Sequence, residues 1–536
     1  MQAVGCRAST AGVRAPRSPR ISRSLALAVF AGLVALAPAA RAGSAGTSAP
    51  PTASQVGAAA PPQGLFAIPR LEAEGPFDST IRLEITNRIR GEFVDWFAKP
   101  DGSATPDNQY DFLGNKFQAG IRVTRDPVEL FVQFQDTLVS NLPTAGLGLG
   151  ATYYANTAHT PQNGTFVRNA WLAWKRPFAV DGLSVTGGRQ LYSDGMDAPA
   201  KDPALLWVQT NRIGQRLLGP VDYTHTGRSF DGGRIAFDAG DWNATAFGFR
   251  ATRGAFEVNA NAEMDVTVAG AALNLKDSPA VSATLGKTIA RVFYFYYGDR
   301  RNVVFLDNRP LALRRLDAGR PANLHTLGGN AIHVEPLGPG NVDAMMYGMT
   351  QMGDWQSQSQ NAYAWGTEVG YQLSGVWAKP WLRLGFNVGS GDTDPVDDTH
   401  GTFFQMLPTA WLYAQFPFYN MMNSQDAFAQ IIVQPHPRIT LRWDVLHWLR
   451  STSSLDLTYF GTGATKNSFF GYGSTGTPKG GHGSLALLTH VLLSVKPADP
   501  LTINFFYAHA FGQSVIAANY AGKQGNYGYV EMTLSF

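Results

Sequence analysis

Arginine side chains recur along one face of many alternating segments in this chain. The clearest segment begins at Ser79, where isoleucine or leucine at alternate positions is interleaved with Arg82, Arg88 and Arg90. The arginine side chain stays charged in proteins, and its planar fork binds a carboxylate or phosphate through two hydrogen bonds. Segments of this kind can therefore present a row of anion-binding groups on one side and an apolar surface on the other.

Assigning the apolar face of every segment to the outside places the remaining face in an interior. The arginines assigned to that interior are Arg82, Arg88, Arg90, Arg122, Arg234, Arg250, Arg291, Arg383 and Arg442. Acidic residues on the same faces are fewer, and they include Glu368 and Asp444. Rows of arginine along a water-filled bore favour anions. The alternative is that these arginines form structural ladders with the inward carboxylates, and the sequence leaves both interpretations open.

Three histidines, His447, His490 and His509, also lie in alternating segments, and a barrel-wall lipase would place a Ser/His pair there. No such pairing can be recognised, so we expect polar or rim histidines and predict no enzymatic activity. Trp448 is a candidate platform for stacking a sugar, because it shares a face with Arg442. Its other interpretation is an aromatic residue at the membrane interface.

One stretch has the acidic pattern of a calcium loop. It runs from Gly389 to Asp398, and its acids are Asp392, Asp394, Asp397 and Asp398. It lacks the spacing and the terminal glutamate of an EF-hand. The loop is therefore retained only as a candidate for a metal, and no cofactor is predicted.

The segments that carry these residues have the pattern of membrane-spanning β-strands. They are about ten to fifteen residues long, the length of a tilted membrane strand. The last one alternates Val530, Met532 and Leu534 with polar residues and ends on Phe536. A final strand of this kind is expected of a bacterial outer-membrane barrel. The alternative for this segment alone is an edge strand of a secreted β-sandwich.

The connections between the segments alternate between short and long. The short ones contain Pro, Gly or Asp, as tight turns require, and are residues 124–127, 179–182, 239–241, 277–279, 336–340, 375–380, 435–437 and 496–500. The long ones are residues 98–109, 142–163, 194–226, 253–262, 300–323, 353–359, 392–419, 451–481 and 513–524. Residues 311–316 are the best candidate for a helical turn. We therefore predict an all-β fold, a transmembrane antiparallel up-and-down β-barrel of about 18 strands with both termini in the periplasm.

The N-terminus indicates export. Arginines precede an apolar run from Leu25 to Ala37, and Ala40–Ala42 supplies a small-x-small cleavage pattern. We expect a signal peptide over residues 1–42, a disordered periplasmic leader over 43–76 and the barrel over 77–536. The single cysteine, Cys6, lies in the expected signal, so the mature chain has no thiol for a disulfide or a metal.

The charge balance argues against a nucleic-acid partner. The chain carries 43 Lys+Arg and 40 Asp+Glu, and the expected signal holds six of the arginines and no acid. The mature chain is therefore near neutral and lacks the basic surplus that nucleic-acid binding requires. A mean hydropathy of −0.12 with 57 glycines and 12% aromatic residues fits a barrel embedded in outer-membrane lipid.

Several short stretches, in the order in which they occur along the chain, carry a resemblance to a known protein family. They are Arg88–Phe93 with Asp95–Phe97, Gly188–Gln190, Arg228–Arg234, and Gly389–Asp392 leading to Thr402–Thr409. Together they resemble the signature stretches of the alginate-export family of outer-membrane barrels. The resemblance implies an eighteen-stranded conduit for an anionic polysaccharide, lined by arginine and aspartate. The lumen positions it implies are Arg88, Arg90, Arg189, Arg234 and Asp444.

The resemblance has one departure. Exporters of this type are gated by a long extracellular loop and a long periplasmic turn near the C-terminus. Residues 142–163 suit the first role, whereas the turn at 496–500 is short. The sequence therefore gives no support for gating from the periplasmic side.

Two functional hypotheses follow. The first is an outer-membrane channel that passes an anionic polysaccharide, alginate or similar, through an arginine-lined lumen; this hypothesis allows for periplasmic export partners. The second is a porin-like channel for the uptake of small anionic or sugar nutrients.

Overall fold

The computed structural model describes residues 72–98, 108–144, 146–409, 413–416, 419–461, 463–466, 473–474 and 483–536. The expected signal peptide and most of the expected leader lie outside these ranges. The last part of the expected leader contains a short strand, β1 (Glu72–Gly75), which pairs with the strand that follows it.

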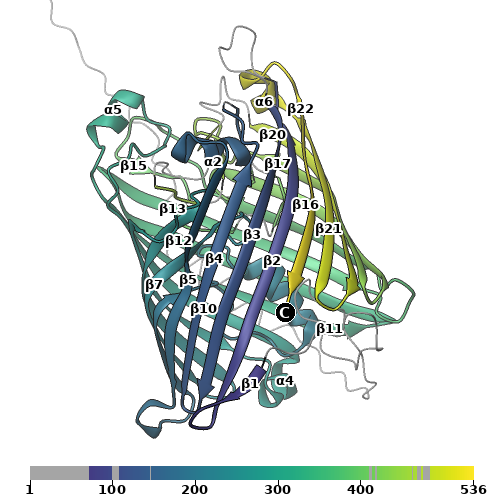
Figure 1. Ribbon diagram of the computed structural model, residues 1–536. Coiled ribbons are helices and arrows are strands. Elements are labelled where there is room, and N and C mark those ends of the chain that lie inside the picture. The colour runs from purple at the N-terminus through teal and green to yellow at the C-terminus, as the bar shows by residue number, and fades with distance from the viewer. Residues whose placement is uncertain are drawn as a thin grey trace, which may run out of the picture. The chain divides into compact units, whose positions relative to one another are not determined.

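The structure is dominated by one sheet of 20 strands, of which β1 and β15 (Thr399–His400) are short additions. The other 18 form a closed antiparallel barrel (Figure 1). They are β2 (Ser79–Asp95), β3 (Gln109–Arg125), β4 (Val128–Ser140), β5 (Gln162–Lys175), β6 (Leu183–Gln190), β7 (Gly227–Asp238), β8 (Trp242–Ala255), β9 (Glu263–Leu275), β10 (Lys287–Asp299), β11 (Ala322–Leu337), β12 (Gly340–Trp355), β13 (Gln358–Gln372), β14 (Trp381–Gly389), β16 (Ser424–His436), β17 (Ile439–Arg450), β20 (Ser484–Ala498), β21 (Leu501–Gly512) and β22 (Gln524–Ser535). The pairing of β22 with β2, from Thr86↔Ser535 to Asp95↔Asn526, closes the ring. The predicted barrel and its strand number are confirmed.

The two predicted sets of connections are present at opposite ends of the barrel. In Figure 1, β1 and the C-terminus lie at the short-turn end, and α2, α5 and α6 lie at the long-loop end. One predicted long loop is wrong. Gly353 pairs with Gln360, and the ladder continues to Trp355↔Gln358, so Gln356 and Ser357 alone form the turn between β12 and β13.

The helices are short and lie in the connections. They are α2 (Leu149–Thr157), η1 (Pro177–Ala179), α3 (Pro203–Val208), η2 (Gln209–Ile213), α4 (Pro279–Leu285), α5 (Leu311–Leu316) and α6 (Ser514–Asn519). The helical turn predicted at Leu311–Leu316 is confirmed as α5. A two-stranded hairpin, β18 (Tyr459–Phe460) with β19 (Gly473–Ser474), lies between β17 and β20. Within the part of the chain that the structure describes, none of the helices has the length and hydropathy needed to cross a membrane.

The wall strands separate an apolar outer face from an inner face of mixed character. On β3, Leu113, Phe117 and Ile121 are 42–50% exposed, whereas the intervening Phe112 and Lys116 are buried. Successive side chains of a strand point to opposite faces, so the exposed set marks the outside of the barrel. The outer surface is therefore a band of large apolar side chains, as a lipid-facing wall requires.

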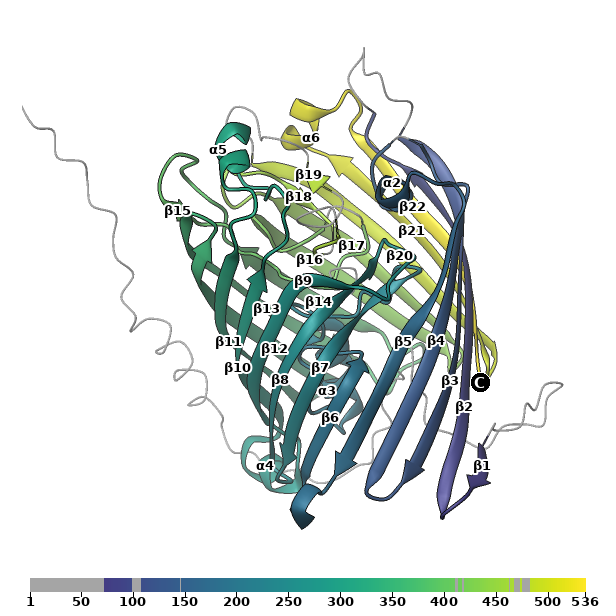
Figure 2. The ribbon, with the colours of Figure 1, turned by 60° about the vertical axis from the view of Figure 1, so that its left-hand side comes forward.

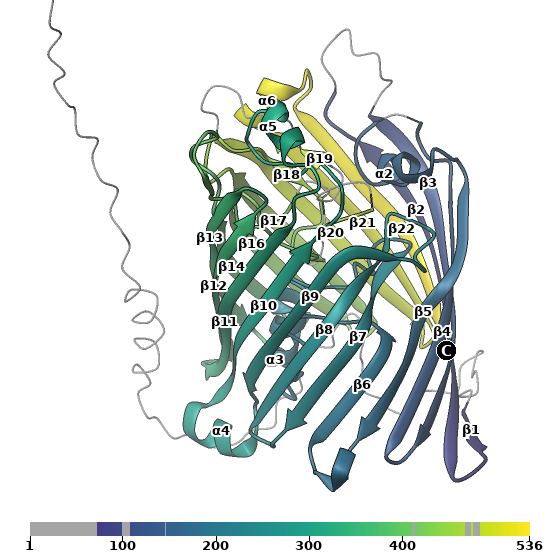
Figure 3. The same ribbon diagram turned by 90° about the vertical axis from the view of Figure 1, so that its left-hand side faces the viewer.

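Two connections fold inward and fill much of the interior. The first inner loop (residues 191–226) joins β6 to β7 and contains α3 and η2. Its Leu205 and Trp207 belong to one buried apolar cluster with the wall residues Phe247 and Phe295. Figures 2 and 3 show α3 behind the near wall strands β7 and β8.

The second inner loop (residues 390–423) joins β14 to β16 and packs against the first. Leu407 donates its backbone N–H to the carbonyl of Leu217 at 2.9 Å and accepts from Gly219 at 2.9 Å. Phe403 and Phe404 lie in the same buried cluster as α3. The two loops therefore form one packed unit inside the ring of strands.

Candidate channel lumen

Most of the predicted lumen arginines do face the interior. These are Arg82, Arg88, Arg90, Arg122, Arg234, Arg291, Arg383 and Arg442, each of which alternates with residues of the outer face. Arg82 lies at the short-turn end, where it pairs with Glu72 of β1 at 3.3 Å and remains 54% exposed. For these arginines the predicted inward direction of the side chain is therefore correct.

Arg250 is a correction, because its side chain lies on the outer face. It alternates with the buried Phe249 on β8 and shares its face with the exposed Trp242. Its guanidinium pairs with Glu263 of β9 at 3.1 Å. The prediction failed because the inner face of β8 is also apolar, since Phe247 and Phe249 pack against the first inner loop.

Arg189 is the second correction. It lies opposite Asp231 in the β6–β7 register, and their side chains form two hydrogen bonds of 2.7 and 2.6 Å. The neighbouring pair, Gln190↔Phe230, is buried and faces inward. Arg189 and Asp231 therefore form an ion pair on the outside of the barrel, near its long-loop end.

Three cations from β2, β3 and β5 hold one turn of the first inner loop. Lys116 contacts the Asp222 carboxylate at 2.7 Å, and Arg168 contacts it at 3.0 Å. Arg88 donates to three successive backbone carbonyls, those of Asp222, Tyr223 and Thr224, at 3.0, 3.1 and 2.7 Å. The loop is thus fixed to the wall by groups that would otherwise line an open bore.

The Asp222 carboxylate is the point where this cluster meets the lumen. About half of its side chain, 51%, is exposed, whereas the side chains of Lys116 and Arg168 are buried behind it. Enclosure by protein raises the pKa of Asp222, but the charges of Lys116, Arg168 and Arg88 outweigh this effect and hold the pKa well below its usual range. The cluster therefore carries more positive than negative charge at neutral pH.

The start of the first inner loop is held on the opposite side. Arg291 of β10 contacts Asp194 at 2.6 Å and Asp197 at 2.9 Å. Asp202 then caps α3, where its side chain accepts from the backbone N–H groups of Ala204 and Leu205. These contacts hold the segment that precedes α3, and the N-terminus of this helix, against the barrel wall.

A buried ladder of alternating charges anchors η2. Arg212 of η2 contacts Glu368 of β13 at 2.7 Å, and Arg383 of β14 contacts the same carboxylate at 3.2 Å. Arg383 also pairs with Asp343 of β12. All four side chains are nearly inaccessible to solvent, so these charges satisfy one another.

Arg442 and Asp444 on β17 form a further buried pair at 2.7 Å. Arg442 also donates to the backbone carbonyl of Tyr413 in the second inner loop at 3.2 Å. The ladder interpretation thus describes Arg88, Arg90, Arg291, Arg383 and Arg442, which are paired within the wall or with the inner loops.

Besides Arg82 at the short-turn end, two inward arginines remain open to solvent. Arg122 is partly exposed and bridges Glu84 and Glu129, each at 2.7 Å. Arg234 of β7 is half-buried, faces the interior beside Thr186 of β6, and makes no hydrogen bond or ion pair with any residue that the structure describes. Arg234 is therefore the lumen cation most available to a passing anion.

The candidate calcium loop is held by its own backbone. Asp392 accepts from the N–H groups of Asp394 and Gly401, at 2.8 and 2.9 Å, and Asp397 accepts from that of Thr399 at 2.9 Å. Each of these carboxylates acts as an acceptor within a turn. The contacts give no support for a metal at Asp392, Asp394, Asp397 and Asp398.

A family model described as alginate export matches residues 80–479. The chain belongs to the alginate export family. The match covers the barrel from β2 to the connection before β20, and thus both inner loops and most of the inward arginines.

Solved structures similar to this alginate export family member are outer-membrane proteins. OpdK of Pseudomonas aeruginosa, in a crystal structure with vanillate, is 10% identical with a TM-score of 0.53, over 85% of this chain and 98% of that chain. OccAB2 of Acinetobacter baumannii is 10% identical with a TM-score of 0.52, and a BenF-like porin of Pseudomonas fluorescens is 9% identical with a TM-score of 0.50, both over the same shares of the two chains. No curated protein matches. The family and the fold are those of bacterial outer-membrane channels, so the protein resides in the outer membrane.

Several interior charges of this alginate export family member were missed by sequence analysis. Arg212, Arg216 and Asp222 lie in the first inner loop, where no strand alternation exists to assign a direction. Arg168 lies at a register shift of β5, between the pairs Gln133↔Asn169 and Phe134↔Val167. A bulge of this kind inserts an extra residue and breaks the alternation. The only sequence feature that could have pointed to these charges was the presence of basic residues in the longest predicted loop.

Trp448 is a further correction, since it faces outward and is 46% exposed. Gln430 pairs with Asp444 and Ala429 with Leu446, so Val445 is an extra residue in β17. The bulge reverses the facing of every later residue of the strand. Trp448 therefore does not share a face with Arg442, and the sugar platform proposed for it is wrong.

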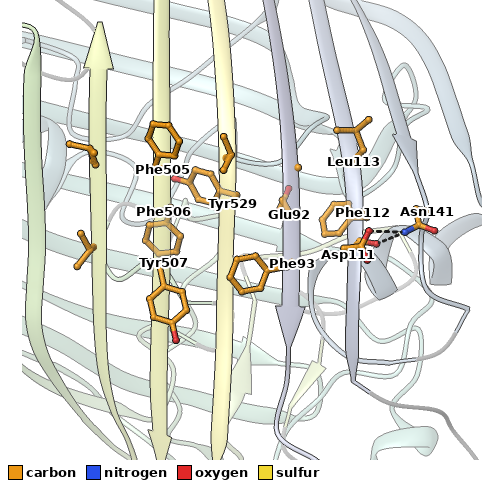
Figure 4. Close-up of a pocket in the computed structure, with 14 residues that line it drawn as sticks. Glu92, Phe93, Asp111, Phe112, Leu113, Asn141, Phe505, Phe506, Tyr507 and Tyr529 are labelled. Atoms are coloured by element: carbon orange, nitrogen blue, oxygen red, sulfur yellow. Dashed lines mark hydrogen bonds between the residues drawn. The ribbon is translucent and has the colours of Figure 1, made fainter.

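The outer wall carries a groove where β2 and β22 meet. It has a volume of about 640 Å³, and its lining includes Phe93, Leu113, Tyr507 and Val530 (Figure 4). The groove exists because Gly91 has no side chain, and a Cβ there would meet nothing within 4 Å. Since these side chains lie on the membrane-facing side, we do not assign the groove to a transported solute.

Proposed function

We propose that this protein is a passive channel for small anionic solutes, such as organic acids that carry a carboxylate. The observation that carries the proposal is Arg234, an inward arginine that is open to solvent and has no partner among the described residues. A guanidinium of this kind offers a weak, reversible site to a carboxylate. Weak binding permits passage, whereas a tight site would trap the solute.

The excess positive charge around Asp222 supports the same proposal. Lys116 and Arg168 share this one carboxylate, and Arg88 adds its charge at the adjacent backbone carbonyls. A solute carboxylate near Asp222 would feel the positive charge of Arg88 and Arg168, which lie behind this turn of the inner loop. Several weak cationic positions along the wall favour anions over cations.

The packing of the inner loops favours small solutes over polymers. Both loops are anchored by buried ion pairs, such as Arg212 with Glu368 at 2.7 Å and Arg291 with Asp194 at 2.6 Å. Displacing them to admit a polysaccharide chain would expose paired charges that are costly to separate. The similarity to OpdK, whose crystal structure contains vanillate, a small aromatic carboxylate, agrees with this size class.

Export of an anionic polysaccharide is the second candidate function. The match to the alginate export family supports it. Under this hypothesis Arg234 and the Asp222 cluster would bind successive sugar carboxylates, and the inner loops would have to move together.

Planar-bilayer recording of the purified protein tests the proposal. We expect anion-selective channels whose current is reduced by millimolar vanillate or another small organic acid and is unaffected by a neutral sugar of similar size. Block by uronic-acid oligomers at lower concentrations than by the monomer would favour polysaccharide passage. Cation selectivity would contradict both candidates.

We also propose that residues 1–42 are a cleaved signal peptide. The apolar run from Leu25 to Ala37 followed by Ala40–Ala42 supports this assignment. N-terminal sequencing of protein from outer membranes is expected to begin at Gly43, and a sequence that begins upstream of Leu25 would contradict it.

A further inference from the structure

A second polar cluster lies in the wall, away from Arg234 and Asp222. Asp444 of β17 is its centre, and around it lie His447 of the same strand, His490 of β20 and Asp426 of β16. All four side chains are at most 1% exposed. One ligand atom from each of Asp444, His447 and His490 can be chosen so that all three lie within 4.8 Å of one another.

The bulge at Val445 builds this cluster. Without it, residues three apart on a strand would face opposite sides, whereas here Asp444 and His447 both point inward. His490 lies directly opposite Asp444 in the β17–β20 register and completes the set. Bulges are frequent where a strand must redirect a side chain toward a functional site.

The hydrogen bonds orient one nitrogen of each ring. Nδ1 of His447 lies 3.0 Å from both oxygens of Asp426, which leaves its Nε2 directed at Oδ2 of Asp444, 3.4 Å away. Nε2 of His490 lies 2.6 Å from the same oxygen. Nε2 of His447 and Nε2 of His490 thus converge on one oxygen of Asp444. Asp426 accepts from the other nitrogen of His447, and a carboxylate in that position is the usual outer partner of a metal-binding histidine.

The charges of the cluster leave room for a cation. Arg442 pairs with Asp444 at 2.7 Å, so two carboxylates face one guanidinium when both imidazoles are neutral. The formal sum is then negative. A proton on His447 would bring the sum to zero and a divalent metal ion would make it positive by one, so either cation is attracted and the two alternatives differ in a measurable way.

We propose that Asp444, His447 and His490 bind a divalent transition-metal ion of the Zn²⁺ class. Two imidazole nitrogens and one carboxylate oxygen form a common ligand set for this ion, with bonds of about 2.0–2.2 Å. Asp426 acts as the outer partner that holds the His447 ring. The ion would join β16, β17 and β20 from inside the wall, as a structural site.

The test uses the purified full-length mature protein in detergent, stripped with EDTA and titrated with Co²⁺ as the probe. We expect a single ion per chain, with visible absorption bands of nitrogen- and oxygen-coordinated Co²⁺ that Zn²⁺ abolishes. His447→Gln and His490→Gln are expected to weaken binding at least about tenfold, and Asp426→Asn by roughly 10–100-fold.

His509→Gln is the matched control, because His509 lies on β21 and contacts Asn526 and Gln524 instead of the cluster. It is expected to bind Co²⁺ as the wild type does. Circular dichroism of each variant confirms that the barrel is folded. Asp426→Asn keeps an acceptor for Nδ1 of His447, so it tests the site even where a histidine variant fails to fold. Wild-type protein that binds no stoichiometric Co²⁺, or that binds it no more tightly than the folded variants of the cluster, would overturn the proposal and leave a protonated His447.

Discussion

Arg212 in the first inner loop and Glu368 on β13 are 156 residues apart in the chain, yet Nε of Arg212 lies 2.7 Å from Oε2 of Glu368. This pair fixes η2 to the barrel wall in a region that excludes solvent. Breaking one half of such a pair leaves an uncompensated buried charge, at a cost of about 3–5 kcal/mol.

We therefore expect Glu368→Gln to loosen the first inner loop. The substitution leaves Arg212 without a carboxylate, whereas Arg383 keeps Asp343. Single-channel recording should show larger or noisier conductance than in the wild type, and unfolding should occur at a lower temperature. Arg250→Gln on the outer wall is the control. Unchanged conductance and stability in Glu368→Gln would show that the loop is held by other contacts.

Arg234→Gln is expected to reduce anion selectivity while leaving the barrel as stable as the wild type, because Arg234 pairs with no described residue. The anion-to-cation permeability ratio, taken from the reversal potential in a salt gradient, should fall by roughly twofold. The same substitution at Arg250, which lies outside, should leave the ratio unchanged. Equal ratios in both variants would remove Arg234 from the ion path.

Asp222→Asn should change selectivity in the opposite direction. The substitution removes the one carboxylate that Lys116 and Arg168 share, so Asp222 no longer opposes the positive charge of Arg168. We expect a higher anion-to-cation permeability ratio together with a lower unfolding temperature. A ratio at or below that of the wild type would mean that the lumen solution does not sense this cluster.

A pH dependence is expected in the second inner loop, at His400. Its ring stacks on Trp355 at 4.0 Å and its Nδ1 lies 2.7 Å from Oε1 of Gln360. Burial lowers the pKa of His400 to about 3, with nearby Arg309 acting in the same direction and Asp307 opposing it. The folded loop therefore holds a neutral imidazole. As the pH falls below the usual histidine pKa of about 6.5, the contact loses up to roughly 1.4 kcal/mol per pH unit until about pH 3.

Hydrogen exchange of residues 390–409 provides the measurement. Protection should decrease between pH 6.5 and pH 4, after correction for the intrinsic pH dependence of exchange. A His400→Gln variant should lack this decrease, because glutamine does not titrate. An identical profile in the variant would place the pH dependence elsewhere.

The barrel could be predicted from the sequence because its wall repeats one rule. Ile81 to Ile89 alternates outward apolar with inward polar residues, and tight turns such as residues 124–127 contain the residue types that such turns need. The strand number, most of the alternation of short and long connections, and the inward direction of Arg88 and Arg90 follow from that rule.

The alternation of apolar and polar residues failed to predict side-chain direction where the barrel interior is filled by protein instead of water. Against the inner loops the inner face of β8 is as apolar as the outer face, so Phe249 points inward and Arg250 outward. It failed again at Val445, because a bulge is a backbone feature with no side-chain signal in this sequence. Asp194, Asp197 and Asp222, which pair with wall cations, lie in the first inner loop, whose fold depends on tertiary contacts.

The β2–β22 pairing has a consequence for how the protein is made. Every other pairing of the 18 barrel strands joins neighbours along the barrel sequence, separated at most by a loop such as the first inner loop, whereas Thr86 and Ser535 meet across 449 residues. Until β22 is synthesised and docked, β2 and β21 both present unpaired edges that invite aggregation. Biogenesis must therefore protect the free edges of two strands at opposite ends of the chain until the β2–β22 pairing closes the barrel.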